Sequence, residues 1–182
     1  ADTARWFMLS DSPPGRDINW SDSGVKGAWK FINKIWNLIN DNKDIFQTDD
    51  LVEDKESKNY FDLKKITNKT IFEVNNNINA FQMNVAIAKI HELVNFLTNF
   101  QPQTNTEKNA FRESLTTLIR IIEPMVPHLA EECWSITDHD YFNGHPTKFT
   151  GGGHGYDPIN RSMHGIFIAH GPALKEGVSI NS

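Results

Sequence analysis

One long stretch of this chain contains no glycine, and this feature constrains its fold more than any other. No glycine occurs between Ala28 and Asn143, whereas eight of the eleven glycines lie at or after Gly144. Glycine weakens helices and favours turns, so the glycine-free part is typical of helices and the remainder of loops and strands. Five of the seven histidines also lie beyond residue 138. We therefore place a boundary near Trp134.

The spacing of apolar residues predicts helices throughout the glycine-free part. They recur every three or four residues, as on one face of a helix, in the segments 21–39, 60–78, 83–97, 104–122 and 127–134. Ser21 or Ser23 is a suitable N-cap for the first segment, and Thr104 with Glu107 forms a capping box for the fourth. Residues 40–59 lose the period and are rich in acidic side chains, which indicates a polar connection. Because amphipathic helices bury their apolar faces against each other, we predict an all-α fold, an antiparallel helical bundle over residues 21–134.

The tail, residues 135–182, is predicted to be irregular and rich in glycine and histidine. It contains at most a short strand, Gly165 to His170. A single strand is not stable alone, so we expect residues 138–182 to be poorly packed.

The composition excludes several classes of protein. There are 18 Lys and Arg against 23 Asp and Glu, a net charge of −5, so any nucleic-acid-binding surface must be local. One cysteine, Cys133, cannot form an intramolecular disulfide and favours a reducing compartment. No apolar run approaches the roughly 20 residues of a membrane span, and residues 1–10 lack the pattern of a signal peptide. We expect a cytoplasmic protein with no membrane contact.

Three ordered sequence blocks carry a resemblance to a known family. They are the opening ADTARWFMLSDSPPGRDINWSDSGVKGAWKFINKIWNLI, FQMNVAIAKIHELVN (Phe81 to Asn95) and IIEPMVPHLAEECW (Ile121 to Trp134). Together, residues 1–134 resemble the helical anticodon-binding domain of bacterial class I leucyl-tRNA synthetases. The resemblance implies a tRNA-binding domain whose partner is leucine-specific tRNA and whose parent enzyme uses ATP to make leucyl-tRNA.

The same resemblance sets the expectations for catalysis. The family's nucleotide-binding sheet, its His-x-Gly-His element and its lysine loop have no counterpart in this chain. We therefore expect no catalytic residue and no cofactor in this fragment. Residues 1–20 are interpreted as a connector from a catalytic domain that is missing here, with which the bundle would pair.

Seven basic residues are candidate tRNA contacts. Lysines at i, i+4 and i+8 share one helix face and could contact phosphates, although a solvated helix face is an equal alternative. The candidates are Arg16, Lys26, Lys30, Lys34, Lys64, Lys65 and Lys69. Trp29, Trp36 and Trp134 lie at apolar positions and are predicted to be core residues. His128 is predicted to be a buried, hydrogen-bonded histidine rather than a catalytic one.

The tail resembles a different family. Gly152 to Asp157, the pair Ser162 and Met163, and Ile166 to Ala173 are similar to a C-terminal piece of the nucleotide pyrophosphatase/phosphodiesterase family of the alkaline phosphatase superfamily. That resemblance implies that His154 is a zinc ligand. The nucleophile and other ligands have no counterpart in residues 1–133, so zinc is expected only if the tail retains a site. A fragment of a zinc-dependent phosphodiesterase is therefore an alternative function, and the chain reads as a junction of two unrelated fragments.

A purely structural bundle is a third hypothesis. It predicts an exposed apolar patch formed by Trp6, Phe7, Met8 and Leu9, which a catalytic domain would normally cover. Such a patch would drive self-association.

Overall fold

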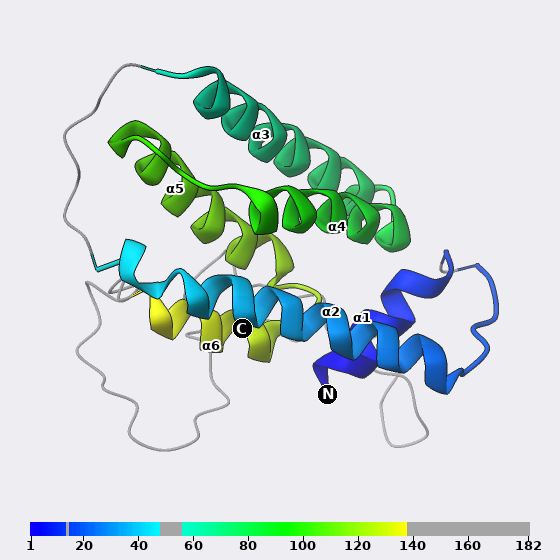
Figure 1. The fold of residues 1–182 in the computed structure, drawn as a ribbon. Coiled ribbons are helices and arrows are strands. Elements are labelled where there is room, and N and C mark those ends of the chain that lie inside the picture. Colours follow the sequence, from blue (N-terminus) through cyan, green and yellow to red (C-terminus); the bar gives the residue numbers. More distant parts are fainter. Residues whose placement is uncertain (14, 48–55, 138–182) are drawn as a thin grey trace, which may run out of the picture. The chain divides into compact units, whose positions relative to one another are not determined.

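A computed structural model describes residues 1–13, 15–47 and 56–137 (Figure 1). Over these ranges the chain contains helices and no strand, which confirms the predicted all-α fold class for this part. The helices are α1 (Asp2–Asp11), α2 (Asp22–Asp41), the 3-10 helix η1 (Lys43–Ile45), α3 (Lys58–Asn79), α4 (Met83–Asn99), α5 (Asn105–Ile122) and α6 (Pro127–Ile136). The described residues all belong to one unit, Ala1–Asp140. The predicted strand at 165–170 and the predicted poor packing of 138–182 lie outside the described residues.

All five helices predicted from periodicity are present as α2 to α6, with ends within two residues of the predicted ones. The Oγ atom of Ser21 accepts a hydrogen bond from the Gly24 backbone N–H at 3.1 Å, which confirms the N-cap of α2. Thr104 caps α5 in the same way, accepting from the Glu107 N–H at 3.2 Å. Pro127 occupies the first turn of α6, where its missing N–H costs nothing.

Residues 1–20 differ from the prediction. Instead of a plain connector, they begin with α1, and Trp6 and Phe7 are only 1% and 3% exposed. The predicted exposed patch is therefore wrong for these two residues, although Met8 is 44% exposed and Leu9 is half-buried. The Trp6 ring stacks on Phe31 of α2 with a centroid distance of 5.2 Å. The bundle itself thus covers Trp6 and Phe7, two of the four residues of the predicted patch.

The helices form two groups, one of α1, α2 and α6 and the other of α3, α4 and α5 (Figure 1). In the first group α2 packs against α1 and α6. In the second, α3 and α4 form a hairpin, and both pack against α5. Contacts of α4 with α1 and α2, and of α5 with α6, join the groups. The long polar connection after α2 therefore leads from one group into the other.

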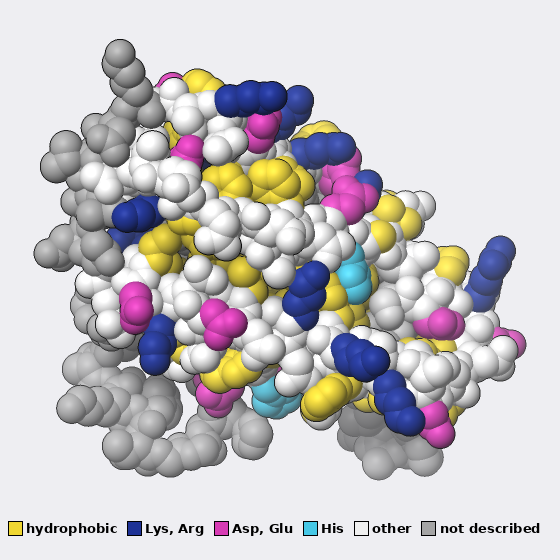
Figure 2. Space-filling view, viewed as in Figure 1, with side chains coloured by type: hydrophobic (Ala, Val, Ile, Leu, Met, Phe, Trp, Pro, Cys, Tyr) yellow, Lys and Arg dark blue, Asp and Glu magenta, His cyan; other side chains and the backbone are white. Residues whose placement is uncertain are grey.

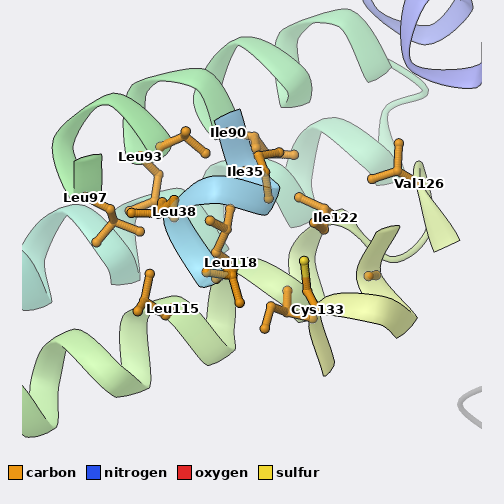
Figure 3. Packing of buried hydrophobic residues seen from close by; sticks show 14 of the residues in the cluster. Ile35, Leu38, Ile90, Leu93, Leu97, Leu115, Leu118, Ile122, Val126 and Cys133 are labelled. Carbon is orange, nitrogen blue, oxygen red and sulfur yellow. The ribbon is translucent and has the colours of Figure 1, made fainter. Parts of the chain in front are cut away.

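The centre of the core lies where α2, α4, α5 and α6 meet (Figure 3). Ile35, Ile90 and Leu118 are completely buried there. Cys133 of α6 is also completely buried, and this burial raises the pKa of its thiol to about 12. A thiol with so high a pKa stays protonated, so Cys133 behaves as a small apolar core residue.

Asp2 connects the first helix to the last. One carboxylate oxygen accepts the Leu129 backbone N–H at 2.8 Å, and the other lies 2.8 Å from Nδ1 of His128, which donates to it. The N-cap position of α6 is Val126, whose side chain makes no capping bond. Asp2 therefore caps α6 from another helix, satisfying an N–H that α6 cannot pair internally.

Glu107 connects the start of α5 to the start of α3. Its carboxylate accepts the Gln103 backbone N–H at 2.7 Å and the hydroxyl hydrogen of Ser57. The bond from Gln103, followed by that from Ser57, lowers the pKa of Glu107. Although Glu107 is only 2% exposed, its carboxylate is well satisfied.

Candidate nucleic-acid interface

The lysines of α2 lie on a face of that helix turned away from its buried side chains. Four-residue spacing places Lys26, Lys30 and Lys34 in one row, whereas Ile35 and Ile39 are completely buried. Figure 2 shows basic side chains following the course of α2 across this view. Lys26 and Lys30 are exposed, and neither makes an ion pair within the part of the chain that the structure describes. These two ammonium groups are therefore available to a phosphate.

Lys34 differs from the other two because it is half-buried and held in place. Its Nζ donates to the Oδ1 of Asn95 in α4 at 2.7 Å. The partner is a neutral amide, so the positive charge is not cancelled, and an ammonium has two further hydrogens to donate. Lys34 thus offers a positioned charge beside the two exposed ones.

Two of the three candidate lysines of α3 lie next to acidic groups. Lys64 Nζ lies 2.7 Å from a carboxylate oxygen of Glu113, and Lys69 Nζ lies 3.8 Å from one of Glu73. Lys89 of α4 adds contacts to Glu73 at 3.4 Å and Glu92 at 2.9 Å. Lys65 is exposed. Because carboxylates lie among these lysines, α3 attracts phosphate less strongly than α2 does.

Arg16 lies apart from both helices' lysines in sequence, in the turn after α1. Its backbone N–H donates to the Pro13 carbonyl at 3.0 Å, and its side chain is exposed. Arg16 is thus an exposed cation that makes no ion pair among the described residues.

Trp29 is the clearest correction to the predicted core. We expected it to be buried, but it is 56% exposed. Its neighbours at i+4 and i+8 are Asn33 and Asn37, so Trp29 begins a polar row of α2 rather than belonging to the apolar stripe that contains Ala28. The spacing of Trp29, Asn33 and Asn37 could have indicated from the sequence that Trp29 is exposed. Trp36 and Trp134 are half-buried, and the guanidinium of Arg120 lies 5.5 Å from the Trp134 ring centroid.

An open groove of about 590 Å³ begins at Trp29. Sequence reasoning did not find it, because its walls come from two helices far apart in the chain. It is lined by Trp29, Lys30, Asn33, Lys34, Asn37, Leu38, Asp41, Asn42, Thr98 and Gln101. An exposed aromatic ring, two lysines and several amides are groups that nucleic-acid-binding surfaces use.

His91 lies beside this surface on α4. Its ring stacks on Phe31 with a centroid distance of 3.5 Å and lies 6.0 Å from the Trp6 ring. Burial, followed by the positive charge of Lys34, lowers the pKa of His91. Near neutral pH this imidazole is therefore an uncharged aromatic member of the contact between α1, α2 and α4.

The prediction of a buried, hydrogen-bonded histidine at position 128 is confirmed only in part. His128 is hydrogen-bonded, to Asp2, but 58% of its side chain is exposed, so the expected burial is wrong. The cause is the position of His128 in the first turn of α6, where Nδ1 lies 2.8 Å from the Asp2 carboxylate while most of the side chain faces solvent.

Metal ligation was expected only at His154, which lies outside the described residues. Within residues 1–13, 15–47 and 56–137 no group of three or more His, Cys, Asp or Glu side chains could hold a metal ion. None of the helices in these ranges is long and apolar enough to span a bilayer.

The described residues thus form an all-α helical domain with a basic face on α2 beside a groove that contains an exposed tryptophan. Comparison with known proteins identifies the family: residues 62–152, half of the chain, match the anticodon-binding domain of tRNA ligase. The chain belongs to this family.

The similar curated proteins agree with one another. A leucine–tRNA ligase of Parvibaculum lavamentivorans is 38% identical over 140 residues, which are 76% of this chain and 16% of that protein. One of Maricaulis maris is 40% identical over 134 residues, which are 74% of this chain and 16% of that protein. The chain thus spans about one-sixth of the length of these relatives.

A solved structure shares the fold. It is the ternary complex of an Agrobacterium radiobacter LeuRS with tRNA and LeuAMS, with a TM-score of 0.67 and 24% sequence identity. The similarity covers 76% of this chain and 18% of that one. The bundle described above is therefore an arrangement already seen in a synthetase.

Proposed function

We propose that this chain is a non-catalytic helical domain that supports the binding of leucine-specific tRNA in a leucine–tRNA ligase. Its family and the names of its relatives support the class of partner. The similar solved structure was determined with tRNA. The observation that carries the proposal is the pair Lys26 and Lys30, two exposed lysines of α2 without an acidic partner among the described residues.

The chemistry of these lysines fits a supporting role. Each lysine that contacts a phosphate displaces counterions, so affinity falls as salt rises. The chain as a whole carries a net charge of −5, which opposes long-range attraction of an RNA. A few local phosphate contacts on an acidic domain give weak, salt-sensitive binding. Such binding assists a larger enzyme better than it holds tRNA alone.

The activity of the whole enzyme is part of the same proposal. The parent would use ATP to attach leucine to tRNA in the cytoplasm, and the bundle would act together with its catalytic domain. The residues of α2 would hold and orient the tRNA backbone while the reaction takes place elsewhere.

The test is the binding of leucine tRNA and of an unrelated tRNA to the purified chain in a salt series. With two or three phosphate contacts, affinity should fall by about 10- to 40-fold between roughly 50 and 200 mM salt. Lys30→Glu should weaken binding, whereas Lys69→Glu, a matched charge reversal at an exposed α3 lysine that lies 3.8 Å from a Glu73 carboxylate oxygen, should have a smaller effect. Equal effects of the two substitutions would contradict the assignment to α2.

A purely structural bundle is the competing function, and one observation favours it. Phe72 of α3 and Phe81, between α3 and α4, are 67% and 68% exposed. A contiguous patch of such side chains marks a surface that docks against another domain. If neither tRNA binds even at the lowest salt, the bundle is a scaffold, and its docking surface is on the α3–α4 hairpin rather than at Trp6 and Phe7.

A further inference from the structure

We infer that the groove along α2 holds an unpaired stretch of RNA, with one base stacked on Trp29 and the neighbouring phosphates on Lys30 and Lys34. This inference rests on the proposed function and adds the form of the RNA that is bound. It is carried by the position of one exposed aromatic ring at the end of a groove with two lysines.

Trp29 has the properties of a stacking platform. Its side chain is 56% exposed, although burial of an indole is strongly favourable. Asn33, one turn further along α2, also lines the groove; its Nδ2 donates to the Trp29 backbone carbonyl at 2.7 Å, and its amide oxygen takes no part in that bond. A base stacked on the ring would therefore find a hydrogen-bond acceptor beside it.

The lysines fix where the backbone of the RNA lies. Lys30 follows Trp29 directly, and Lys34 is held across the groove wall by Asn95 at 2.7 Å. Because Lys34 is already ordered, binding a phosphate there loses little side-chain entropy. Lys30 and Lys34 are one and five residues after Trp29 on the same helix, and all three line the groove. One short stretch of RNA would therefore contact the ring with a base and the two lysines with its phosphates.

The far end of the groove determines where along it the phosphates of the RNA lie. Asp41 lines that end, which is also the C-terminus of α2, where the helix dipole is negative. Both effects repel phosphate, so the backbone is confined to the end with Lys30 and Lys34. From Trp29 to Asp41 the groove follows twelve residues of helix, about 18 Å. A duplex hides its base faces in the stack, whereas an unpaired strand exposes them to Trp29.

The experiment compares a short single-stranded RNA with the same sequence annealed in a duplex, at low salt. The wild-type chain should bind the single strand more tightly. Trp29→Ala should weaken that binding by about 5- to 150-fold, the range for losing one stacked base, and Trp29→Phe should restore most of it. Trp20→Ala is the matched control, because Trp20 is also exposed, at 63%, but does not line the groove.

Two outcomes would overturn the inference. One is wild-type affinity of Trp29→Ala for the single strand, and the other is tighter binding of the duplex. If Lys30→Glu still weakens tRNA binding in either case, the proposed function stands and only the stacking site is wrong. If neither substitution matters for any RNA, both fail. Circular dichroism of each variant checks that the helices are retained.

Discussion

Asp2 lies near the start of this sequence, and its carboxylate joins α1 to α6. It is 9% exposed, accepts the Leu129 N–H, and lies 3.4 Å from the guanidinium of Arg5. Asp2→Ala would leave the first turn of α6 without its cap. We expect a loss of about 1–2 kcal/mol in the free energy of unfolding, measured with urea. Asp17→Ala, at an exposed aspartate, should change it by less than about 0.5 kcal/mol; an equal loss in both would refute the capping role.

Candidate residues could be predicted from spacing, but their partners could not. The row of Lys26, Lys30 and Lys34 follows from the helical period alone. That Lys64 faces Glu113 does not, because 49 residues separate them in sequence. Trp29 was misassigned because the apolar stripe and the polar row of α2 are adjacent, and a large aromatic residue at their border can belong to either.

At the scale of the element, α2 to α6 could be predicted and α1 could not. The five helices each contain several turns of regular apolar spacing or a recognisable cap. Residues 6–9 are instead a continuous apolar run, which shows no period, and α1 has no side-chain cap at its own N-terminus. Its stability comes from packing on α2 and α4, which is information that only the folded chain contains.

Two glycines of α2 give opposite predictions for the same substitution. A Cβ added to Gly24 would lie 2.5 Å from the ring of Phe7, which is buried, whereas one added to Gly27 would meet nothing within 4 Å. Alanine normally stabilises a helix relative to glycine by up to about 1 kcal/mol, so Gly27→Ala should be stabilising. Gly24→Ala should instead lose about 1–3 kcal/mol, because α1 must move away.

Thermal and urea unfolding of the two variants measure this difference. Stabilisation by both substitutions would mean that α1 does not pack on the start of α2 as described.

At the scale of the whole molecule, stability should fall on the acid side in two steps. The pKa of His91 is lowered from 6.5, so the unfolded chain takes up a proton more readily than the folded one. Uncharged His91 therefore adds to the free energy of unfolding above about pH 6.5, and this addition is lost as the pH falls below that value. Glu107, with a pKa lowered from 4.5, contributes above about pH 4.5 and loses its contribution below it.

His91→Phe separates the two steps. Phenylalanine keeps a ring against Phe31 but cannot take up a proton. The free energy of unfolding, measured with urea from about pH 8 to about pH 3, should lose the upper step in this variant and keep the lower one. If wild type and variant lose stability in parallel through pH 6.5, His91 is not the group responsible.

The contact between Asp2 and α6 has a consequence for how the protein is made. A ribosome releases α1 before α6, and the N–H group that Asp2 caps is synthesised 127 residues after Asp2. At about 5–20 residues per second, this takes roughly 6 to 25 seconds. During that time the nascent chain carries α1 without α6. The apolar side chains of α1 must then be covered by α2 and α4 or by a chaperone.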